Sequence, residues 1–371
     1  MGASMNNLLN KIGLNNVNGY RYVKKLDGGK ASVVCLYENE EGSKQVIKML
    51  IAPRSEEELD SFKSEPQILA QLNRHDTINI PKLISGLVQV TEYPVYYYIM
   101  EYIDGVTLSS YIDNNPLPWD ANKALKMIAC ITSALSKTSR HHIVHRDLHP
   151  GNIILKKTFN LDKQFAKINV DVDVIIMDYG CHKESFRNLA YYFTDTDYSS
   201  KSIQFNKRDY LRHFGAISTW SPEFLKDPHS VDVHHDIWAL GVMLFRFITK
   251  KYPLWAKSFS DLYEKLVLKF DIDWKLIKES KVHWAIEEFL IKMLDPNPKC
   301  RPLHNDIIQI IIGLLSDDLY KQSDSFINEY LVRNGDYWTC PNCFKTVFPS
   351  GSRCTACGQM SDSFDWINPF L

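Results

Sequence analysis

The chain has 371 residues, with 43 basic and 44 acidic side chains and a formal net charge of −1. This length suits a two-lobed domain with an appended module, and the 45% share of hydrophobic residues is ordinary for a folded protein. The balanced charge excludes attraction of the whole chain to nucleic acid or to an anionic membrane surface. The longest apolar run, at 307–315, is too short for a membrane span and predicts a core helix.

The chain after residue 19 is expected to begin with a small β-rich half that contains one helix. Segment 55–72 has apolar residues at helical spacing, and Ser55 before three glutamates is a plausible N-cap. Pro66 argues mildly against this helix, because proline lacks the backbone N–H of an interior position. Short β-rich runs between turn residues predict strands at 20–26, 32–38, 44–50 and 93–103.

The pattern becomes mainly helical after Gly105, so the expected fold class is α+β. The insertion at 156–165 is predicted to extend a hairpin, and helical character continues to about Val332. Helical spacing is clear at 119–140, 234–250 and 283–294. The expected units are an N-terminal extension at 1–19, a small lobe at 20–103, a large lobe at 104–320, a helical linker at 321–337, a cysteine-rich module at 338–362 and a tail at 363–371.

The stretch I-V-H-R-D-L-H-P-G-N-I at 143–153 holds Asp147 and Asn152 on a short loop between apolar runs. Phosphoryl transfer needs such a pair: a carboxylate accepts the proton of a hydroxyl, and an amide oxygen helps to hold the metal on the nucleotide. The stretch resembles the catalytic loop of eukaryotic-type protein kinases, H-R-D-L-x-x-x-N. The resemblance implies a bilobal protein kinase fold at 20–320, ATP and Mg²⁺ (or Mn²⁺) as cofactors, a protein substrate, and Asp147 as catalytic base.

Two further matches supply the ion pair and the metal ligand of this family. Lys48, in Q-V-I-K-M-L, resembles the strand lysine that contacts the α- and β-phosphates. Its expected partner is Glu65, because I-L follows it closely as in the family pattern, although the glutamates at 56–58 compete for the role. Asp178, in D-Y-G after an apolar strand, resembles the metal-binding aspartate of D-F-G. The resemblance implies that Asp178 and Asn152 bind Mg²⁺.

The loop that covers the phosphates is the weakest match to the family pattern. The family shows G-x-G-x-x-G-x-V, while the chain shows D-G-G-K-A-S-V-V and keeps only the middle glycine. Glycines let the backbone approach phosphate closely, so an alternative is a plain hairpin and a pseudokinase. By the resemblance, the nucleotide-binding residues are Asp27, Gly29, Ser32, Val34 and Lys48, with Met100 (the gatekeeper), Glu101 and Ile103 at the hinge.

Three motifs without catalytic groups separate protein kinases from their relatives. S-P-E at 221–223, D-I-W-A-L-G at 236–241 and C-R-P at 300–302 resemble segments of the large lobe of protein kinases. By that resemblance Asp236 supports the catalytic loop and Arg301 pairs with Glu223. Small-molecule kinases share a loop like H-G-D-L-H-P-G-N but lack these three motifs. A protein kinase is therefore expected, with a pseudokinase scaffold and a small-molecule or lipid kinase as the alternatives.

The class of hydroxyl is indicated less clearly than the reaction. Serine/threonine kinases usually have lysine two residues after the catalytic aspartate, and this chain has His149; Gly215-Ala216 stands where G-T is usual. The patterns of tyrosine kinases are also missing, and a serine/threonine kinase is expected. The segment 178–223 is rich in hydroxyl side chains, and Arg146 resembles the arginine that pairs with a loop phosphate. Autophosphorylation that orders this segment is predicted, with a solvated insertion as the alternative.

The cysteines fall into a scattered set and a clustered set. Scattered cysteines at 35, 130, 181 and 300 suggest a reducing compartment and a cytoplasmic location, in the cell of origin or in a host cell. The clustered set forms two C-x-x-C pairs, which suit a closed tetrahedral Zn²⁺ site and resemble a zinc ribbon. Two disulfides are the alternative. The predicted zinc ligands are Cys340, Cys343, Cys354 and Cys357.

The expected role of the ribbon is structural, because four thiolates leave no open position on the metal for catalysis. Recruitment of a protein partner or packing on the large lobe is expected. Nucleic acid is not the expected ligand, because only Lys345 and Arg353 supply cations within the ribbon.

Overall fold

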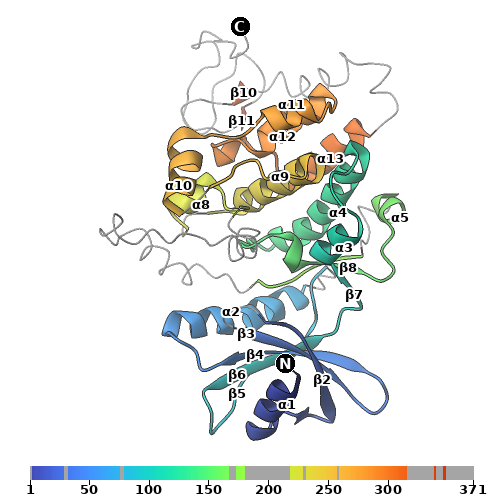
Figure 1. The fold of residues 1–371 in the computed structure, drawn as a ribbon, viewed down its shortest axis with the longest axis vertical. Coiled ribbons are helices and arrows are strands. Elements are labelled where there is room, and N and C mark those ends of the chain that lie inside the picture. The colour runs from blue at the N-terminus through green and yellow to red at the C-terminus, as the bar shows by residue number, and fades with distance from the viewer. Residues whose placement is uncertain are drawn as a thin grey trace.

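The chain forms a small β-rich lobe and a larger helical lobe, stacked along the long axis of the molecule (Figure 1). The first hundred residues build the small lobe, and the segment that follows Glu101 leads into the large lobe. In the part of the chain that is described, no helix is long and apolar enough to cross a membrane. The computed structural model describes residues 2–28, 32–75, 79–166, 173–179, 218–228, 231–256, 259–315, 338–339 and 346–347.

The small lobe contains one antiparallel six-stranded sheet in the order β1-β2-β3-β4-β6-β5. The predicted strands are confirmed, because alternating apolar side chains bury both faces of its centre. The face toward the large lobe carries Val46, Leu50, Tyr98 and Met100, and the opposite face carries Cys35, Ile47, Met49 and Val95. The strands are β1 (Asn16–Val17), β2 (Tyr20–Gly28), β3 (Ser32–Glu38), β4 (Lys44–Ile51), β5 (Leu83–Gln89) and β6 (Val95–Glu101).

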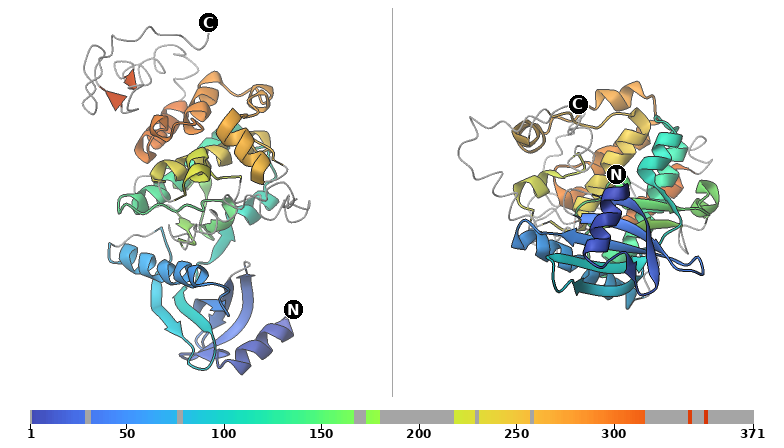
Figure 2. Two further views of the ribbon diagram at one scale, coloured as in Figure 1. Left: turned by 90° about the vertical axis from the view of Figure 1, so that its left-hand side faces the viewer. Right: turned by 60° about the horizontal axis from the view of Figure 1, so that its bottom comes forward.

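Helix α2 (Glu56–Asn73) lies between this sheet and the large lobe (Figures 1 and 2). The hydroxyl oxygen of Ser55 accepts a hydrogen bond from the backbone N–H of Glu58 at 3.2 Å, which makes Ser55 the predicted N-cap. Phe62 and Leu69 are buried on the apolar side of the helix. Pro66 lies inside the helix without ending it, so the packing of the apolar side outweighs the missing N–H.

Residues 5–17 belong to the packed structure of the small lobe. Helix α1 (Gly2–Lys11) covers the face of the sheet that points away from the large lobe (Figure 2). Leu9 is fully buried there in one apolar cluster with Ile47 and Met49. The Tyr37 hydroxyl donates a 2.6 Å hydrogen bond to the backbone oxygen of Leu14 and fixes the segment after the helix.

The large lobe is built around α4 (Ala121–Ser139) and α9 (Val233–Thr249), which pack against each other. Helix α13 (His304–Leu314) packs on α4, and the predicted core helix of this region is thereby confirmed. The other helices are α3 (Leu108–Asn114), α8 (Pro222–Lys226), α10 (Phe259–Tyr263), a π-helical segment (Glu264–Lys269), α11 (Lys275–Glu279) and α12 (Trp284–Met293), with 3₁₀ turns at Pro150–Asn152 and Pro298–Cys300.

A small antiparallel sheet lies at the end of the large lobe that faces the small lobe (Figure 1). It consists of β7 (Gly105–Thr107), β8 (Ile153–Lys156) and β9 (Val174–Ile176). The prediction that the insertion after β8 extends a hairpin is wrong, because residues Leu161–Ala166 form helix α5. Near the C-terminus, β10 (Trp338–Thr339) pairs antiparallel with β11 (Thr346–Val347).

Candidate active site

The backbone of the catalytic loop is held by one buried carboxylate. Asp236, on α9, accepts hydrogen bonds from the backbone N–H groups of His145 at 2.8 Å and Arg146 at 3.0 Å. Arg146 has a φ of 67°, a left-handed conformation that an arginine adopts only under constraint. The two bonds supply that constraint, which is the support that the D-I-W-A-L-G motif predicted. Burial raises the pKa of Asp236 to about 6, although both bonds act against the shift.

His145 connects this loop to the segment between β9 and Asp178. Its Nε2 lies 2.7 Å from the backbone oxygen of Met177, and its Nδ1 accepts the N–H of Asp147 at 3.2 Å. A carbonyl only accepts, so the proton is on Nε2 and the ring is neutral. Burial lowers the pKa of His145 to about 4, which keeps this tautomer in place at neutral pH. The ring therefore sets the distance between the two aspartates that the sequence singles out.

Asp147 and Asn152 face each other across the turn of the loop. The side-chain amide of Asn152 donates to the backbone oxygen of Asp147 at 2.9 Å, and its backbone oxygen accepts from Met177 N–H at 2.8 Å. These bonds fix the side-chain oxygen of Asn152 away from Asp147. Burial raises the pKa of Asp147 to about 8, and the negative charge of Asp178 adds to the shift. A cation at Asp178 would remove that second contribution.

The sequence His149-Pro150-Gly151-Asn152 in the loop is explained by local hydrogen bonds and backbone conformation. The Nδ1 atom of His149 accepts the N–H of Gly151 at 3.0 Å, and Pro150 begins a 3₁₀ turn in which its missing N–H is not needed. A Cβ at Gly151 would lie 2.7 Å from the His149 ring, so a larger residue would displace this ring from its hydrogen bond. The Nε2 of His149 approaches Asp147 Oδ2 at 3.7 Å, where the family usually has a lysine.

Lys48 lies between two carboxylates and joins the two lobes. Its ammonium group donates to Glu65 Oε2 at 2.6 Å and to Asp178 Oδ1 at 3.0 Å. Glu65 is therefore the partner that the sequence favoured, on helix α2. Burial alone would lower the pKa of Lys48, but the charges of Asp178 and Glu65 outweigh it, and the pKa is raised. Burial would raise the pKa of Asp178, but Lys48 reverses this and the pKa is lowered.

The competing glutamates of α2 do not take this place. Glu58 binds Arg54, with 2.6 Å between Oε1 and Nη2, and lies in the first turn of the helix. The Arg54 guanidinium lowers the pKa of Glu58. Glu56 is exposed in that same turn, and the side chain of Glu57 lies outside the described part. Of these glutamates, Glu65, which the sequence favoured, is the one that contacts Lys48.

The donor atoms near Asp178 fit a hard divalent cation. Asp178 has a second carboxylate oxygen beyond the one that contacts Lys48, and its side chain is 46% exposed. Its backbone has a φ of 63°, a constrained conformation at the end of β9. Together with the side-chain oxygen of Asn152, these are oxygen ligands of the kind that Mg²⁺ prefers.

The predicted nucleotide-binding residues of the sheet share one face. Val34 is paired with Lys48 between β3 and β4, and Met100 is paired with Val46 between β6 and β4. Paired side chains of neighbouring strands project to the same side, so Val34, Lys48 and Met100 point toward the large lobe. Met100 is buried, and Ile103 follows the sheet with no hydrogen bond of its backbone to any described residue.

The remaining hinge and loop residues lie around this face. Glu101 ends β6, and its N–H donates to the backbone oxygen of Lys82 at 2.9 Å. Asp27 and Ser32 lie on β2 and β3, and residues 29–31 between the two strands lie outside the described part of the chain. Gly29 is one of these residues.

Two of the large-lobe motifs form the ion pair that the sequence predicted. Arg301 forms a two-pronged ion pair with Glu223, with distances of 2.6 and 2.8 Å, and donates to the backbone oxygens of Asp295 and His234. Ser221 caps α8. The bidentate geometry of a buried guanidinium fixes the end of the segment that begins at Asp178.

Comparison with known proteins decides the family. The family model for the protein kinase domain matches residues 20–310. The chain belongs to the protein kinase family. It is 28% identical, over 63% of its length, to the Lactococcus lactis protein named "Probable serine/threonine-protein kinase PknB". It is 27% identical, over 64% of its length, to serine/threonine-protein kinase PrkC of Bacillus subtilis. These matches cover 32% of either relative, so the chain spans about a third of the length of the curated relatives it matches.

Several predicted site residues of this kinase-family chain lie outside the described ranges. They are Gly29 and the four cysteines at 340, 343, 354 and 357, and most of the segment predicted to be phosphorylated, 180–217, lies outside these ranges as well. Among the described residues, no cluster of three or more His, Cys, Asp or Glu side chains is placed to hold a metal ion. The predicted zinc site lies outside the described residues.

Sequence reasoning missed one residue that links the lobes. Asn79, in the loop after α2, donates from its side-chain amide to the backbone oxygen of Val174 at 2.8 Å. Its own backbone oxygen accepts the N–H of Ile176 at 2.8 Å. The loop behind the Lys48–Glu65 pair is thus bonded along the strand that leads to Asp178. A single asparagine in a loop gives no sequence signal for this role.

Proposed function

We propose that the chain is a protein kinase that transfers the γ-phosphate of ATP to serine or threonine hydroxyls of a protein substrate. The observation that carries the proposal is the position of Lys48, bonded to Glu65 on one lobe and to Asp178 next to the catalytic loop. The family membership and the serine/threonine-kinase relatives support it. In protein kinases the lysine–glutamate ion pair and the metal-binding aspartate must both be in place for activity.

In the proposed mechanism Lys48 orients the α- and β-phosphates, and Asp178 and Asn152 hold Mg²⁺ (or Mn²⁺). When bound, that cation would supply positive charge that offsets the negative charge of the phosphates. Asp147 accepts the proton of the substrate hydroxyl, and His145 holds its backbone in position. Met100, Glu101 and Ile103 form the adenine-binding hinge, and Asp27, Gly29, Ser32 and Val34 form the loop and strand over the phosphates.

Two details of the proposal concern segments beyond the described ranges. We propose that autophosphorylation between residues 180 and 217 orders that segment through Arg146, whose backbone Asp236 fixes. Phosphopeptide mapping of fully active enzyme tests this, and phosphate found only elsewhere would contradict it. We also propose that Cys340, Cys343, Cys354 and Cys357 bind a structural Zn²⁺ ion in a ribbon that packs on the large lobe or recruits a protein partner.

The short β10–β11 pair supports the ribbon, because its strands flank the first cysteine pair at 340–343. A hairpin that carries two cysteines in its turn is half of a four-cysteine zinc module. Metal analysis of the purified chain is the test, with one zinc per chain expected. Replacing Cys340 and Cys343 by serine should abolish the zinc, while replacing the buried Cys130 should not.

The test of the kinase activity uses labelled ATP, Mg²⁺ and a generic basic protein as acceptor. We expect labelling by the parent chain, none by Asp178→Ala or Asp147→Asn, and unchanged labelling by Asp113→Asn, an exposed carboxylate of α3. Hydrolysis of the labelled acceptor then distinguishes serine and threonine from tyrosine. Nucleotide binding without transfer would indicate a pseudokinase, and transfer only to a small metabolite or lipid would indicate the other alternative.

A further inference from the structure

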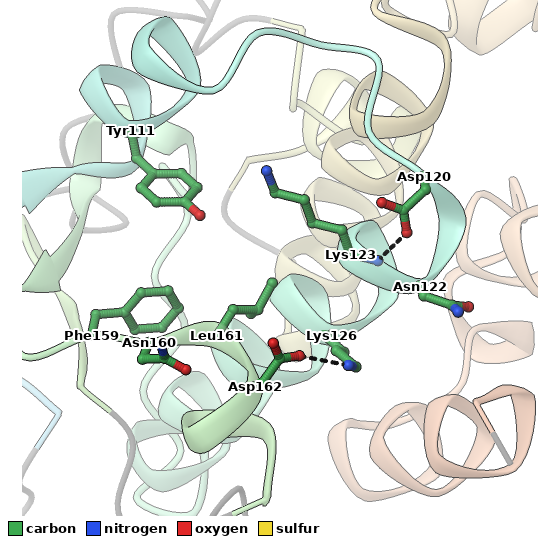
Figure 3. Close-up of a pocket in the computed structure, with 9 residues that line it drawn as sticks. All are labelled: Tyr111, Asp120, Asn122, Lys123, Lys126, Phe159, Asn160, Leu161 and Asp162. Atoms are coloured by element: carbon green, nitrogen blue, oxygen red, sulfur yellow. Dashed lines mark hydrogen bonds and ion pairs between the residues drawn. The ribbon is translucent and has the colours of Figure 1, made fainter.

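A hollow of about 490 Å³ opens on the large lobe beside α3, α4 and α5, and it shares no residue with the candidate active site (Figure 3). One wall comes from α3, one from the first turns of α4, and one from the insertion after β8. Its size is that of a site for a small ligand or for a few side chains of a peptide. The lining residues are Tyr111, Asp120, Asn122, Lys123, Lys126, Phe159, Asn160, Leu161 and Asp162.

The insertion is held against α4 by specific polar contacts. Lys126 Nζ of α4 binds Asp162 Oδ1 of α5 at 2.7 Å. Asp173, at the far end of the insertion, accepts hydrogen bonds from Thr158 at 2.7 Å and from Gln164 at 3.1 Å. Gln164 is buried and returns a bond by accepting the N–H of Asp173 at 3.0 Å. The wall of the hollow is thus a fixed part of the fold, although the proposed phosphoryl transfer does not use it.

Lys123 supplies the cation that faces the hollow. Its ammonium group lies 4.7 Å from the ring centre of Trp119 and 5.7 Å from that of Tyr111, and it extends across the hollow toward Tyr111 (Figure 3). Among the described residues, Lys123 has no carboxylate within ion-pair distance, whereas Asp162 neutralises Lys126. Aromatic rings stabilise a partly desolvated ammonium group without cancelling its charge. An anionic group of a ligand would be bound here.

The rest of the lining favours a ligand in which an apolar group lies next to the anionic group. Tyr111 and Phe159 form an edge-to-face pair with ring centres 6.3 Å apart, and Leu161 lies beside them (Figure 3). The carboxylates of Asp120 and Asp162 border the hollow and disfavour a doubly charged phosphate. A single carboxylate next to an aromatic or large aliphatic group satisfies both features.

We propose that this hollow docks a linear segment of a protein partner in which an aspartate or glutamate neighbours an aromatic or large aliphatic residue. The carboxylate binds Lys123, and the apolar side chain packs against Tyr111 and Phe159. Asn122 and Asn160 also line the hollow. A peptide fits better than a free acid, because the charged and apolar contacts come from different walls.

The test measures binding of a fluorescent peptide, Gly-Ser-Asp-Phe-Asp-Leu-Gly-Ser, to the full chain without ATP. We expect saturable binding that Lys123→Gln weakens about tenfold, the loss of one charge-assisted contact. The matched control is Lys163→Gln, an exposed lysine of the same insertion, and it should bind like the parent chain. Phe159→Ala should also weaken binding, and a peptide with both Asp residues replaced by Asn should bind as weakly to the parent as the acidic peptide binds to Lys123→Gln.

Three results would overturn the proposal. They are no saturable binding at millimolar peptide, equal binding by Lys123→Gln and the parent, and full competition by acetate or propionate at the peptide's own concentration. Tighter binding of the same peptide with phosphoserine at the Asp positions would also overturn the choice of a carboxylate. Because ATP is absent from the assay, failure of the proposed kinase activity does not affect the result. Lys123→Gln is expected to label a generic basic protein at the parent rate.

Discussion

The hydroxyl of Tyr179 donates a hydrogen bond to Thr138 Oγ1 at 3.3 Å, and Thr138 in turn donates to the backbone oxygen of Leu135 at 2.9 Å. Tyr179 follows Asp178 directly, is 2% exposed, and packs its ring 4.8 Å from the ring of His145. The bond therefore fastens the residue after the proposed metal ligand to helix α4. A phenylalanine in this position would keep the ring contact but could not form the bond.

The first prediction separates the two partners of this bond. Tyr179→Phe removes the donor, while Thr138 keeps its bond to Leu135, so we expect a loss of about 1 kcal/mol in unfolding free energy. Thr138→Val leaves a buried hydroxyl on Tyr179 without its partner, and about 1–3 kcal/mol should be lost. Urea unfolding of both single variants and of the double variant measures the difference. The double variant should lose less than the sum of the two.

Turnover should also respond to Tyr179→Phe if the bond holds Asp178 in place. If the bond weakens by about 1 kcal/mol, the ratio of molecules in which Tyr179 is held against α4 to molecules in which it is not falls about fivefold. We expect kcat to fall by up to that factor and the Mg²⁺ concentration for half-maximal rate to rise. A change in stability with an unchanged Mg²⁺ requirement would mean that the bond serves the fold only.

The second prediction concerns the Lys48 cluster. Lys48→Met removes the counter-charge of Glu65, whose side chain is 4% exposed, and leaves Asp178 without its ammonium partner. We expect a loss of about 3–5 kcal/mol in unfolding free energy at pH 7, together with loss of phosphoryl transfer. The loss should shrink as the pH falls, because protonation of Glu65 then removes the unpaired charge.

The control for this variant is Lys24→Met, which changes an exposed lysine of β2. It should stay within about 0.5 kcal/mol of the parent. If Lys48→Met were equally well tolerated, the buried ion pair would not contribute to the fold. Retained phosphoryl transfer in Lys48→Met would contradict the proposed role of the lysine.

Residues with fixed chemistry and spacing could be placed from the sequence. Glu65 was chosen over the glutamates at 56–58 by its distance from an I-L pair, and it is the one that contacts Lys48. Arg301 and Glu223 were matched through short motifs far apart in the chain, and they form the expected ion pair. Such pairs are predictable because the partner of a buried charge must have the opposite charge.

Contacts that depend on tertiary packing could not be placed in this way. Thr138 lies in the middle of a helical pattern, and nothing in the sequence connects it to Tyr179. The insertion after β8 was expected to be a hairpin, but the Lys126–Asp162 ion pair and the bonds of Gln164 favour helix α5. Successive residues of β4 are apolar on both faces of the sheet, so the outer face also has to be covered by another element.

The third prediction tests whether helix α1 stabilises the small lobe by covering the outer face of the sheet. Leu9 of α1 is fully buried against the outer face of the sheet, so Leu9→Ala should lower the unfolding free energy by about 2–5 kcal/mol. Asn10→Ala changes an exposed neighbour on the same helix and should have little effect. Thermal or urea unfolding of the two variants measures this. Equal stability of the two would show that α1 does not stabilise the small lobe.

The fourth prediction concerns stability at acidic pH and rests on His235. Its Nε2 lies 3.1 Å from the backbone oxygen of Arg146, so it carries the proton, and Nδ1 accepts from the Ser221 hydroxyl at 2.8 Å. Burial lowers the pKa of His235 to about 4; the charge of Glu223 opposes the shift, while those of Arg301 and Arg146 add to it. Between its ordinary pKa of about 6.5 and this value, the unfolded chain binds a proton that the folded chain does not.

Stability should therefore fall as the pH is lowered from about 6.5 to about 4, and His235 contributes about 2 kcal/mol of that loss by pH 5. His235→Gln can still donate to the Arg146 oxygen but does not titrate, so its stability should depend less on pH by that amount. Asp236, whose pKa burial raises to about 6, acts in the opposite direction in both chains and cancels from the comparison. Urea unfolding of the parent and the variant at pH 7 and pH 5 measures the difference. Parallel pH dependence of the two chains would contradict the neutral, buried state of His235.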